Sequence, residues 1–234
     1  MNISDKVAIV TGCSKGIGLA TVHALLNKGV KVAGWSRTAP DIKHDNFIFY
    51  ATDVRDIDSV NGSYNATIKD FGEDIRILIN NAGLGYAALM EEMPVEEWVQ
   101  MFETNVNGVF YCSQMVIPKM KEMGEGSIIN IASIAGKEGT PLLAGYCGTK
   151  FAVRGISQAM YKELRDYGIK VTCISPGSVQ TDFFNYMEHI QVNENMMKSE
   201  DVAGSIIYCL ETSANYHPVE LEVRPLMPKG RKTV

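Results

Sequence analysis

The sequence lacks the features that mark secreted, membrane-spanning or metal-centred proteins. Its five cysteines are odd in number and no two have C-x-x-C spacing, so neither a disulfide framework nor a zinc site is indicated. No uncharged apolar run reaches the roughly 18 residues that a membrane-spanning helix needs. Residues 1–6 lack the basic and apolar regions of a secretory signal. We therefore expect a cytoplasmic protein with no metal and no membrane association.

Positive charge is also scarce. Twenty-two Lys+Arg against 27 Asp+Glu give a formal net charge of −5, whereas a nucleic-acid-binding protein normally presents a basic surface. The sequence therefore predicts no nucleic-acid partner and favours a small molecule. With 46% hydrophobic and 21% charged residues, the composition is that of an ordinary globular protein rather than a disordered one.

Apolar, β-rich runs alternate with helical stretches along the whole chain. Several runs are almost continuously apolar, which is typical of strands covered on both faces in a parallel sheet. We therefore predict an α/β fold: a single doubly wound domain over 1–234, with an about seven-stranded parallel sheet and helices on both faces. The expected strands are 6–11, 30–36, 47–52, 75–79, 127–133, 169–175 and 219–223, and the clearest helices are 17–28, 95–123 and 145–167.

The segment 181–199 breaks this alternation because it is rich in aromatic residues and methionine. It follows the end of an expected strand, where ligands bind in open α/β sheets. It is therefore either a lid over an apolar substrate or an ordinary connection packed on the core.

A glycine-rich loop, T-G-C-S-K-G-I-G, joins the first strand to the first helix and contains Gly12, Gly16 and Gly18. Glycines allow a tight turn, close approach of the backbone to a pyrophosphate, and close packing of the helix on the strand. The N-terminus of the helix adds free N–H groups and a positive dipole. The loop therefore predicts a dinucleotide site.

Three further blocks occur in order after this loop. They are N-N-A-G at 80–83, Ser133 at the expected end of the fifth strand followed by Tyr146-x-x-x-Lys150, and P-G-S-V-Q-T at 176–181. With its G-x-x-x-G-x-G spacing, the sequence resembles the short-chain dehydrogenase/reductase family of the intact Ser-Tyr-Lys type. The resemblance implies a Rossmann fold and a nicotinamide dinucleotide cofactor.

The end of the second expected strand bears on which cofactor is used. An acidic residue there would accept the adenosine 2′-OH, but this chain has Ser36 followed by Arg37, and Lys15 lies in the glycine loop. Two cations without a carboxylate favour a 2′-phosphate, so we expect NADP(H); NAD(H) is the alternative if both cations are merely solvated.

The family resemblance implies that Asp53 and Val54 contact the adenine and that Asn81 lines the adenosine ribose side. The candidate cofactor-binding residues are Gly12, Ser14, Lys15, Gly16, Ile17, Gly18, Ser36, Arg37, Asp53, Val54, Asn81, Ala82, Gly83, Tyr146, Lys150, Pro176, Gly177, Val179 and Thr181.

Tyr146 and Lys150 are four residues apart in an expected helix and therefore share one face. A neighbouring ammonium favours the phenolate and should lower the tyrosine pKa towards a useful range. Ser133 can donate a hydrogen bond to a substrate oxygen on which charge develops. The family resemblance implies that these three residues are catalytic, with Lys150 also holding the nicotinamide ribose. It adds Asn105, which would orient a water that relays protons to Lys150.

The expected reaction is hydride transfer between NADP(H) and a carbonyl or secondary alcohol, in the direction of carbonyl reduction, as in 3-oxoacyl reductases. Alternatives are an NAD-dependent alcohol or hydroxysteroid dehydrogenase and a non-catalytic dinucleotide sensor. A sugar-nucleotide epimerase or dehydratase is disfavoured by the glycine spacing and the chain length. Candidate apolar wall residues are Leu84, Tyr86, Leu142, Leu143, Phe183, Phe184, Tyr186, Met187, Met196 and Met197.

The helices 95–123 and 145–167 carry apolar residues around much of their circumference. In the family these helices pack between subunits, so the resemblance implies a homodimer or homotetramer. Burial within one subunit is the alternative.

Overall fold

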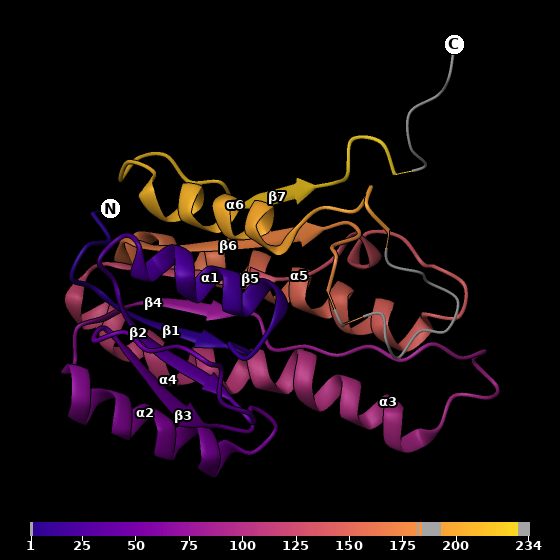
Figure 1. The fold of residues 1–234 in the computed structure, drawn as a ribbon, viewed down its shortest axis with the longest axis horizontal. Helices are drawn as coiled ribbons and strands as arrows, with labels where there is room; N and C mark the ends of the chain where they lie inside the picture. Colours follow the sequence, from indigo (N-terminus) through magenta and orange to yellow (C-terminus); the bar gives the residue numbers. More distant parts are fainter. Residues whose placement is uncertain (1, 182, 184–192, 229–234) are drawn as a thin grey trace.

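The computed structural model describes residues 2–181, 183 and 193–228. Seven parallel strands form one sheet in the order β3-β2-β1-β4-β5-β6-β7 (Figure 1). The strands are β1 Val7–Thr11, β2 Lys31–Ser36, β3 Phe47–Ala51, β4 Ile75–Asn80, β5 Gly126–Ile131, β6 Ile169–Pro176 and β7 Glu220–Val223. The predicted parallel sheet is confirmed.

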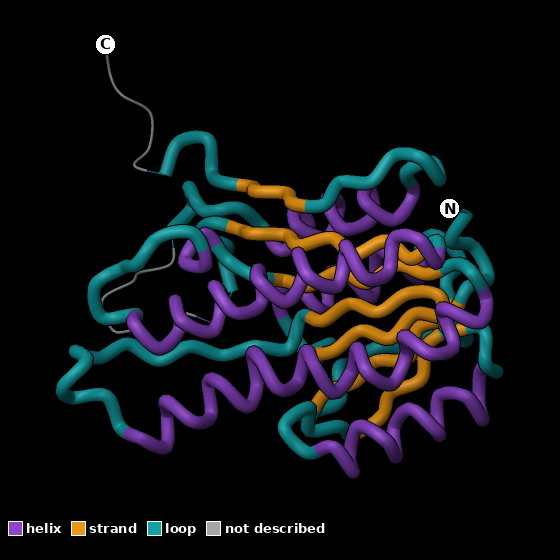
Figure 2. Tube along the Cα trace, turned by 180° about the vertical axis from the view of Figure 1, so that it is seen from behind, coloured by secondary structure: helices purple, strands orange, loops and turns teal. Residues whose placement is uncertain are grey.

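Helices cover both faces of this sheet (Figure 2), which explains the almost continuous apolar strands. Alternate strand residues point to opposite faces, so Val7 and Ile9 enter one core while Ala8 and Val10 enter the other. The second core is closed by α1 Gly16–Leu26 and α6 Ser199–Glu211. The first is closed by α2 Ile57–Phe71, α4 Gly108–Met123 and α5 Ala144–Leu164.

The prediction of a single α-helix over 95–123 is wrong in detail. The segment consists of α3 Val95–Phe102, a π-helical segment at Glu103–Asn107, and α4. A π-helical turn inside a helix often marks a functional site, and this one contains Asn105. The fifth strand also ends earlier than predicted, at Ile131, so Ser133 lies beyond it and caps a short 3₁₀ turn.

The predicted lid over 181–199 falls mostly outside the described residues. Of its described part, Met197 forms a parallel bridge with Val179 and packs against the core beneath α6, and α6 begins at Ser199. The expectation that Met197 lines a substrate pocket is therefore wrong, because its side chain is used in the core.

The strand order determines where a ligand-binding crevice can open at the edge of the sheet. From β1 the chain winds outward through β2 to β3, then returns to β4 on the other side of β1. A crevice opens at such a switch point, outside the carboxyl ends of the strands. None of the described helices is both long and apolar enough to cross a membrane.

Candidate active site

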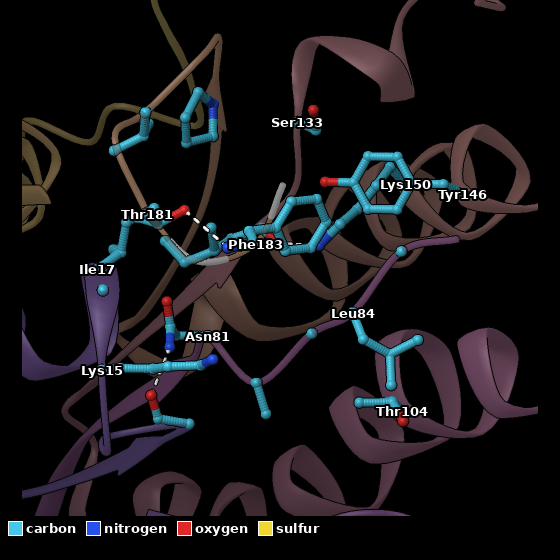
Figure 3. Close-up of a pocket in the computed structure, with 18 of the residues that line it drawn as sticks. Lys15, Ile17, Asn81, Leu84, Thr104, Ser133, Tyr146, Lys150, Thr181 and Phe183 are labelled. Carbon is cyan, nitrogen blue, oxygen red and sulfur yellow. Dashed lines mark hydrogen bonds between the residues drawn. The ribbon is translucent and has the colours of Figure 1, made fainter. Parts of the chain in front are cut away.

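A cavity of about 630 Å³ opens at this carboxyl edge, over the switch point between β1 and β4 (Figure 3). Its walls come from the segments that follow β1 to β6 and from the start of α5. The predicted site residues that line it are Gly12, Ser14, Lys15, Gly16, Ile17, Ser36, Arg37, Asp53, Val54, Asn81, Ala82, Gly83, Ser133, Tyr146, Lys150, Pro176, Gly177, Val179 and Thr181. Thus all but Gly18 and Asn105 are brought together.

The glycine loop needs its glycines for different reasons. Gly12 and Gly16 have φ angles of +65° and +57°, a region that other residues enter at a cost. Gly18 has an ordinary helical backbone, but a Cβ there would lie 2.1 Å from the Gly12 carbonyl oxygen. Gly18 therefore packs behind the loop and does not line the cavity.

Asn81 holds the glycine loop from the side of β4. Its Nδ2 donates to the carbonyl oxygens of Thr11 and Gly12 at 3.0 and 3.1 Å, and its backbone N–H donates to the Thr11 hydroxyl at 3.0 Å. The side chain predicted to line the ribose side thus also fixes the shape of the loop. Sequence reasoning missed this role because the two segments are some 70 residues apart.

The N-terminus of α1 opens into the cavity. Its N-cap residue, Lys15, makes no side-chain capping hydrogen bond, the first turn contains no acidic residue, and Gly16 and Ile17 line the cavity. The first-turn N–H groups and the positive end of the helix dipole therefore face the space where an anion would bind. This arrangement fits the pyrophosphate of a dinucleotide.

Charged residues gather at the β2 and β3 end of the cavity. Arg55 forks onto Asp53, with Nε 3.0 Å from Oδ1 and Nη2 2.6 Å from Oδ2, and this hydrogen bonding lowers the pKa of Asp53. Arg37 is exposed beside them, while Ser36 is buried and donates to the Thr38 carbonyl oxygen at 2.7 Å. The predicted adenine contact of Asp53 would share its carboxylate with Arg55.

Tyr146, Lys150 and Ser133 meet at the opposite end. Lys150 Nζ lies 5.7 Å from the centroid of the Tyr146 ring and donates to the Ile131 carbonyl oxygen at 2.9 Å. Burial lowers the pKa of Lys150 to about 8. Burial also raises the pKa of Tyr146 to about 12, although a hydrogen bond with Ser133 acts in the opposite direction. This corrects the expectation of a lowered tyrosine pKa, because desolvation of the buried phenol outweighs the hydrogen bond with Ser133.

Asn105 lies behind the wall of the cavity. Its Nδ2 donates to the Leu84 carbonyl oxygen at 2.8 Å and to Thr149 Oγ1 at 3.0 Å, and its Oδ1 accepts from the Leu84 N–H at 2.9 Å. These bonds tie the segment after β4 to α5, one residue before Lys150. The side chain therefore acts on the position of its neighbours, and the predicted water relay remains a prediction.

The structure adds residues that sequence reasoning missed. These lining residues are Trp35, Thr38, Thr52, Arg55, Gly85, Thr104, Ile131, Ala132, Ile134, Ala135, Thr140 and Ser178. Arg55 could have been found from the sequence, because an arginine two residues after a predicted adenine-binding aspartate can form an ion pair with that aspartate. The others face the cavity because of the paths taken by the strand ends, the loops and the π-helical segment, which no spacing reveals.

The predicted apolar wall is partly present. Leu84, Leu143 and Phe183 line the cavity, and the Phe183 ring lies 5.3 Å from the Tyr146 ring, tilted by 52°. Tyr86 packs against the buried cluster that contains Leu143 and Tyr146 but does not line the cavity. Leu142 and Met196 do not line the cavity either. Phe184, Tyr186 and Met187 lie outside the described residues.

The fold and this cavity define the class of doubly wound α/β dehydrogenases. The chain belongs to the short-chain dehydrogenase family, whose profile, described as "short chain dehydrogenase", matches residues 6–191. The protein is therefore an oxidoreductase by family. Membership confirms the resemblance that the ordered motifs carried.

Relatives and solved structures agree with this assignment. An uncharacterized oxidoreductase of Staphylococcus saprophyticus is 35% identical, over 96% of this chain and 97% of its own. The closed form of a serine dehydrogenase complexed with NADP+ has a TM-score of 0.88 at 27% identity, covering 97% of this chain and 99% of its own. A 3-ketoacyl-(acyl-carrier-protein) reductase from Brucella melitensis complexed with NADH has the same TM-score and coverage at 26% identity.

Proposed function

We propose that the protein is an NADPH-dependent reductase that converts a carbonyl compound into a secondary alcohol. The observation that carries the proposal is the meeting, in one cavity, of an uncapped helix N-terminus after a glycine loop and the trio of Ser133, Tyr146 and Lys150. The first end suits a dinucleotide and the second suits proton transfer to a carbonyl oxygen. The NADP+ complex of the serine dehydrogenase supports the cofactor type.

NADP(H) is favoured over NAD(H) by the charges at the end of β2. Arg37 is exposed at the rim, Lys15 lies in the glycine loop, and no acidic residue ends β2. Guanidinium and ammonium groups make strong charge-assisted hydrogen bonds with a phosphate. The reductase complexed with NADH keeps an NAD-dependent alcohol or hydroxysteroid dehydrogenase as the second candidate.

The cofactor, when bound, supplies the hydride that reaches the carbonyl carbon. Tyr146 then donates its phenolic proton to the carbonyl oxygen, which becomes the alcohol oxygen. Ser133 donates a hydrogen bond to the same oxygen while negative charge develops there. The Lys150 ammonium stabilises the tyrosinate that remains and returns a proton to it, after which solvent water reprotonates the Lys150 amine. Asn105 holds the surrounding backbone in place. In the oxidative direction, the same tyrosinate would take the proton of an alcohol.

A homodimer or homotetramer is part of the proposal. Phe110 on α4 and Phe151 on α5 are 52% and 45% exposed, and both helices lie on the same face of the sheet. Exposed aromatic rings of this kind commonly mark interfaces between subunits.

Replacement of Tyr146 by phenylalanine tests the proposed activity. The change keeps the ring and removes only the proton donor. We expect NADPH oxidation with a panel of ketones and aldehydes to fall at least 1,000-fold, whereas the affinity for NADPH, measured by fluorescence titration, stays within threefold. Tyr167→Phe is the matched control, because Tyr167 is exposed in the 3₁₀ turn after the C-terminal end of α5, whereas the cavity meets the N-terminal part of this helix.

Turnover that persists in Tyr146→Phe would contradict the proposed proton donor. NADPH binding without turnover of any carbonyl or alcohol by the wild-type protein would support the third candidate, a non-catalytic dinucleotide sensor.

A further inference from the structure

The charges that line the cavity are segregated. Among the described lining residues, the charged ones are Lys15, Arg37, Asp53, Arg55 and Lys150. The first four lie on the glycine loop and after β2 and β3, where the dinucleotide would bind. Only Lys150 lies at the other end, and it is a member of the proton-transfer trio.

The wall beyond Tyr146 is apolar. Phe183 and Leu84 pack against a buried cluster that includes Ala135, Leu143 and Tyr146. All five residues line the cavity, and none of them carries a charge at neutral pH. Figure 3 shows the Phe183 ring beside Tyr146 and Lys150. A flat or branched apolar group would therefore lie against aromatic and aliphatic side chains on the substrate side.

Lys150 is poorly placed to pair with a charged substrate. The residue is only 5% exposed, and its Nζ donates to the Ile131 carbonyl oxygen under the Tyr146 ring. Arg55, another cation of the cavity lining, already forms a forked ion pair with Asp53. Among the described lining residues, no cation besides Lys150 lies at this end. A carboxylate next to the reacting carbonyl would thus be buried against Phe183 and Leu143 without a charge partner from these residues, which is strongly unfavourable.

We propose that the substrate is an uncharged ketone or aldehyde whose substituents beside the carbonyl are alkyl or aryl groups or neutral esters, and that α- and β-oxo acids are excluded. This rests on the proposed carbonyl reduction and goes beyond it by naming the chemical class. A 3-oxoacyl thioester also meets the requirement at its reacting end. In each turnover the carbonyl gains one hydride at carbon from NADPH and one proton at oxygen, giving the alcohol and NADP+.

Matched ester and acid pairs test the proposal on the full chain. The probes are ethyl 3-oxobutanoate with 3-oxobutanoate and methyl benzoylformate with benzoylformate, each with saturating NADPH at pH 7. We expect kcat/KM for the ester to exceed that for the acid at least 100-fold in each pair that is turned over. Equal rates, a preference for the acid, or no turnover of either ester overturns the proposal.

The same experiment separates the two proposals. If the protein reduces the acids or other carbonyl compounds but not the esters, the proposed substrate class is wrong and the reductase proposal still stands. No NADPH oxidation with any carbonyl overturns the reductase proposal itself.

A gain-of-function variant gives a second test. Thr140 lines the cavity near Leu143, and its side chain is exposed, so a longer side chain can extend there without disturbing the core. Thr140→Arg places a cation at the substrate end, and Thr140→Gln controls for length. We expect the acid-to-ester ratio of kcat/KM to be at least tenfold higher in the arginine variant than in the glutamine variant. Equal ratios in the two variants count against the proposal.

Discussion

Replacement of Gly18 by alanine tests whether the glycine loop is held in place by direct backbone contact with α1. Gly18 lies in the first turn of α1, and a Cβ there would be 2.1 Å from the Gly12 carbonyl oxygen and 2.5 Å from Asn81 Nδ2. Both atoms belong to the hydrogen bond, 3.1 Å long, that fixes the loop. The methyl group cannot fit unless the helix, the loop or Asn81 moves.

The magnitude follows from opposing effects. Alanine is favoured over glycine in a helix by about 1 kcal/mol. Overpacking a well-packed site costs about 1–3 kcal/mol, and loss of the Asn81 hydrogen bond costs about 1 kcal/mol more. We therefore expect Gly18→Ala to lower the free energy of unfolding by about 1–3 kcal/mol, where each kcal/mol corresponds to roughly 2–4 °C in Tm.

The matched control is Gly62→Ala in the middle of α2. A Cβ at Gly62 meets no atom within 4 Å, so only helix propensity acts and Tm should rise by roughly 2–4 °C. Thermal unfolding followed by circular dichroism measures both effects. NADPH titration of Gly18→Ala should show affinity at least tenfold weaker, because the loop that is proposed to meet the phosphates would shift. A Gly18→Ala protein as stable as Gly62→Ala, with wild-type NADPH affinity, would refute the reasoning.

Three further predictions follow from the same site. The kcat/KM for carbonyl reduction should be flat below pH 8 and fall about tenfold per pH unit above it. Burial lowers the pKa of Lys150 to about 8, so above this pH Lys150 loses its proton while Tyr146 keeps its own. A flat profile up to pH 10 would contradict this. Arg37→Ala should raise KM for NADPH about 10–100-fold, as expected for loss of a charged hydrogen bond, while KM for NADH changes less than threefold; steady-state assays with both cofactors decide. Arg154 Nη1 donates to the Gly136 carbonyl oxygen in the turn that Ser133 caps. Arg154→Met should therefore lower kcat about tenfold with little change in KM for NADPH, and Arg154→Lys should recover part of the lost kcat. A loss confined to Tm would mean that Arg154 is only structural.

The sheet could be predicted from the sequence because its cause is local. Strands that are covered on both faces are almost continuously apolar, and the helices between them supply the two covers. The same holds for the glycine loop, since Gly12 and Gly16 are required by the backbone conformation of the loop itself.

The π-helical segment at Glu103–Asn107 could not be predicted, and the partners of its central residue are distant in sequence. Asn105 bonds to Leu84, 21 residues earlier, and to Thr149, 44 residues later. The fork of Arg55 on Asp53 shows the intermediate case, in which the partners are close in sequence but their pairing depends on how the loop after β3 folds. The raised pKa of Tyr146 likewise depends on packing, because Phe183 and Leu143 remove water from the ring.

The two asparagines explain how the site keeps its shape. Asn81 ties the segment after β4 to the glycine loop after β1, and Asn105 ties the same segment to α5 beside Lys150. The segment 81–84 is thus bonded on one side to the expected dinucleotide end and on the other to the proposed proton-transfer end. Because both ends are fixed to one short stretch of backbone, their separation is set by the fold and not by the ligand. Such preorganisation suits a reaction in which a hydride and a proton must reach adjacent atoms of one carbonyl group.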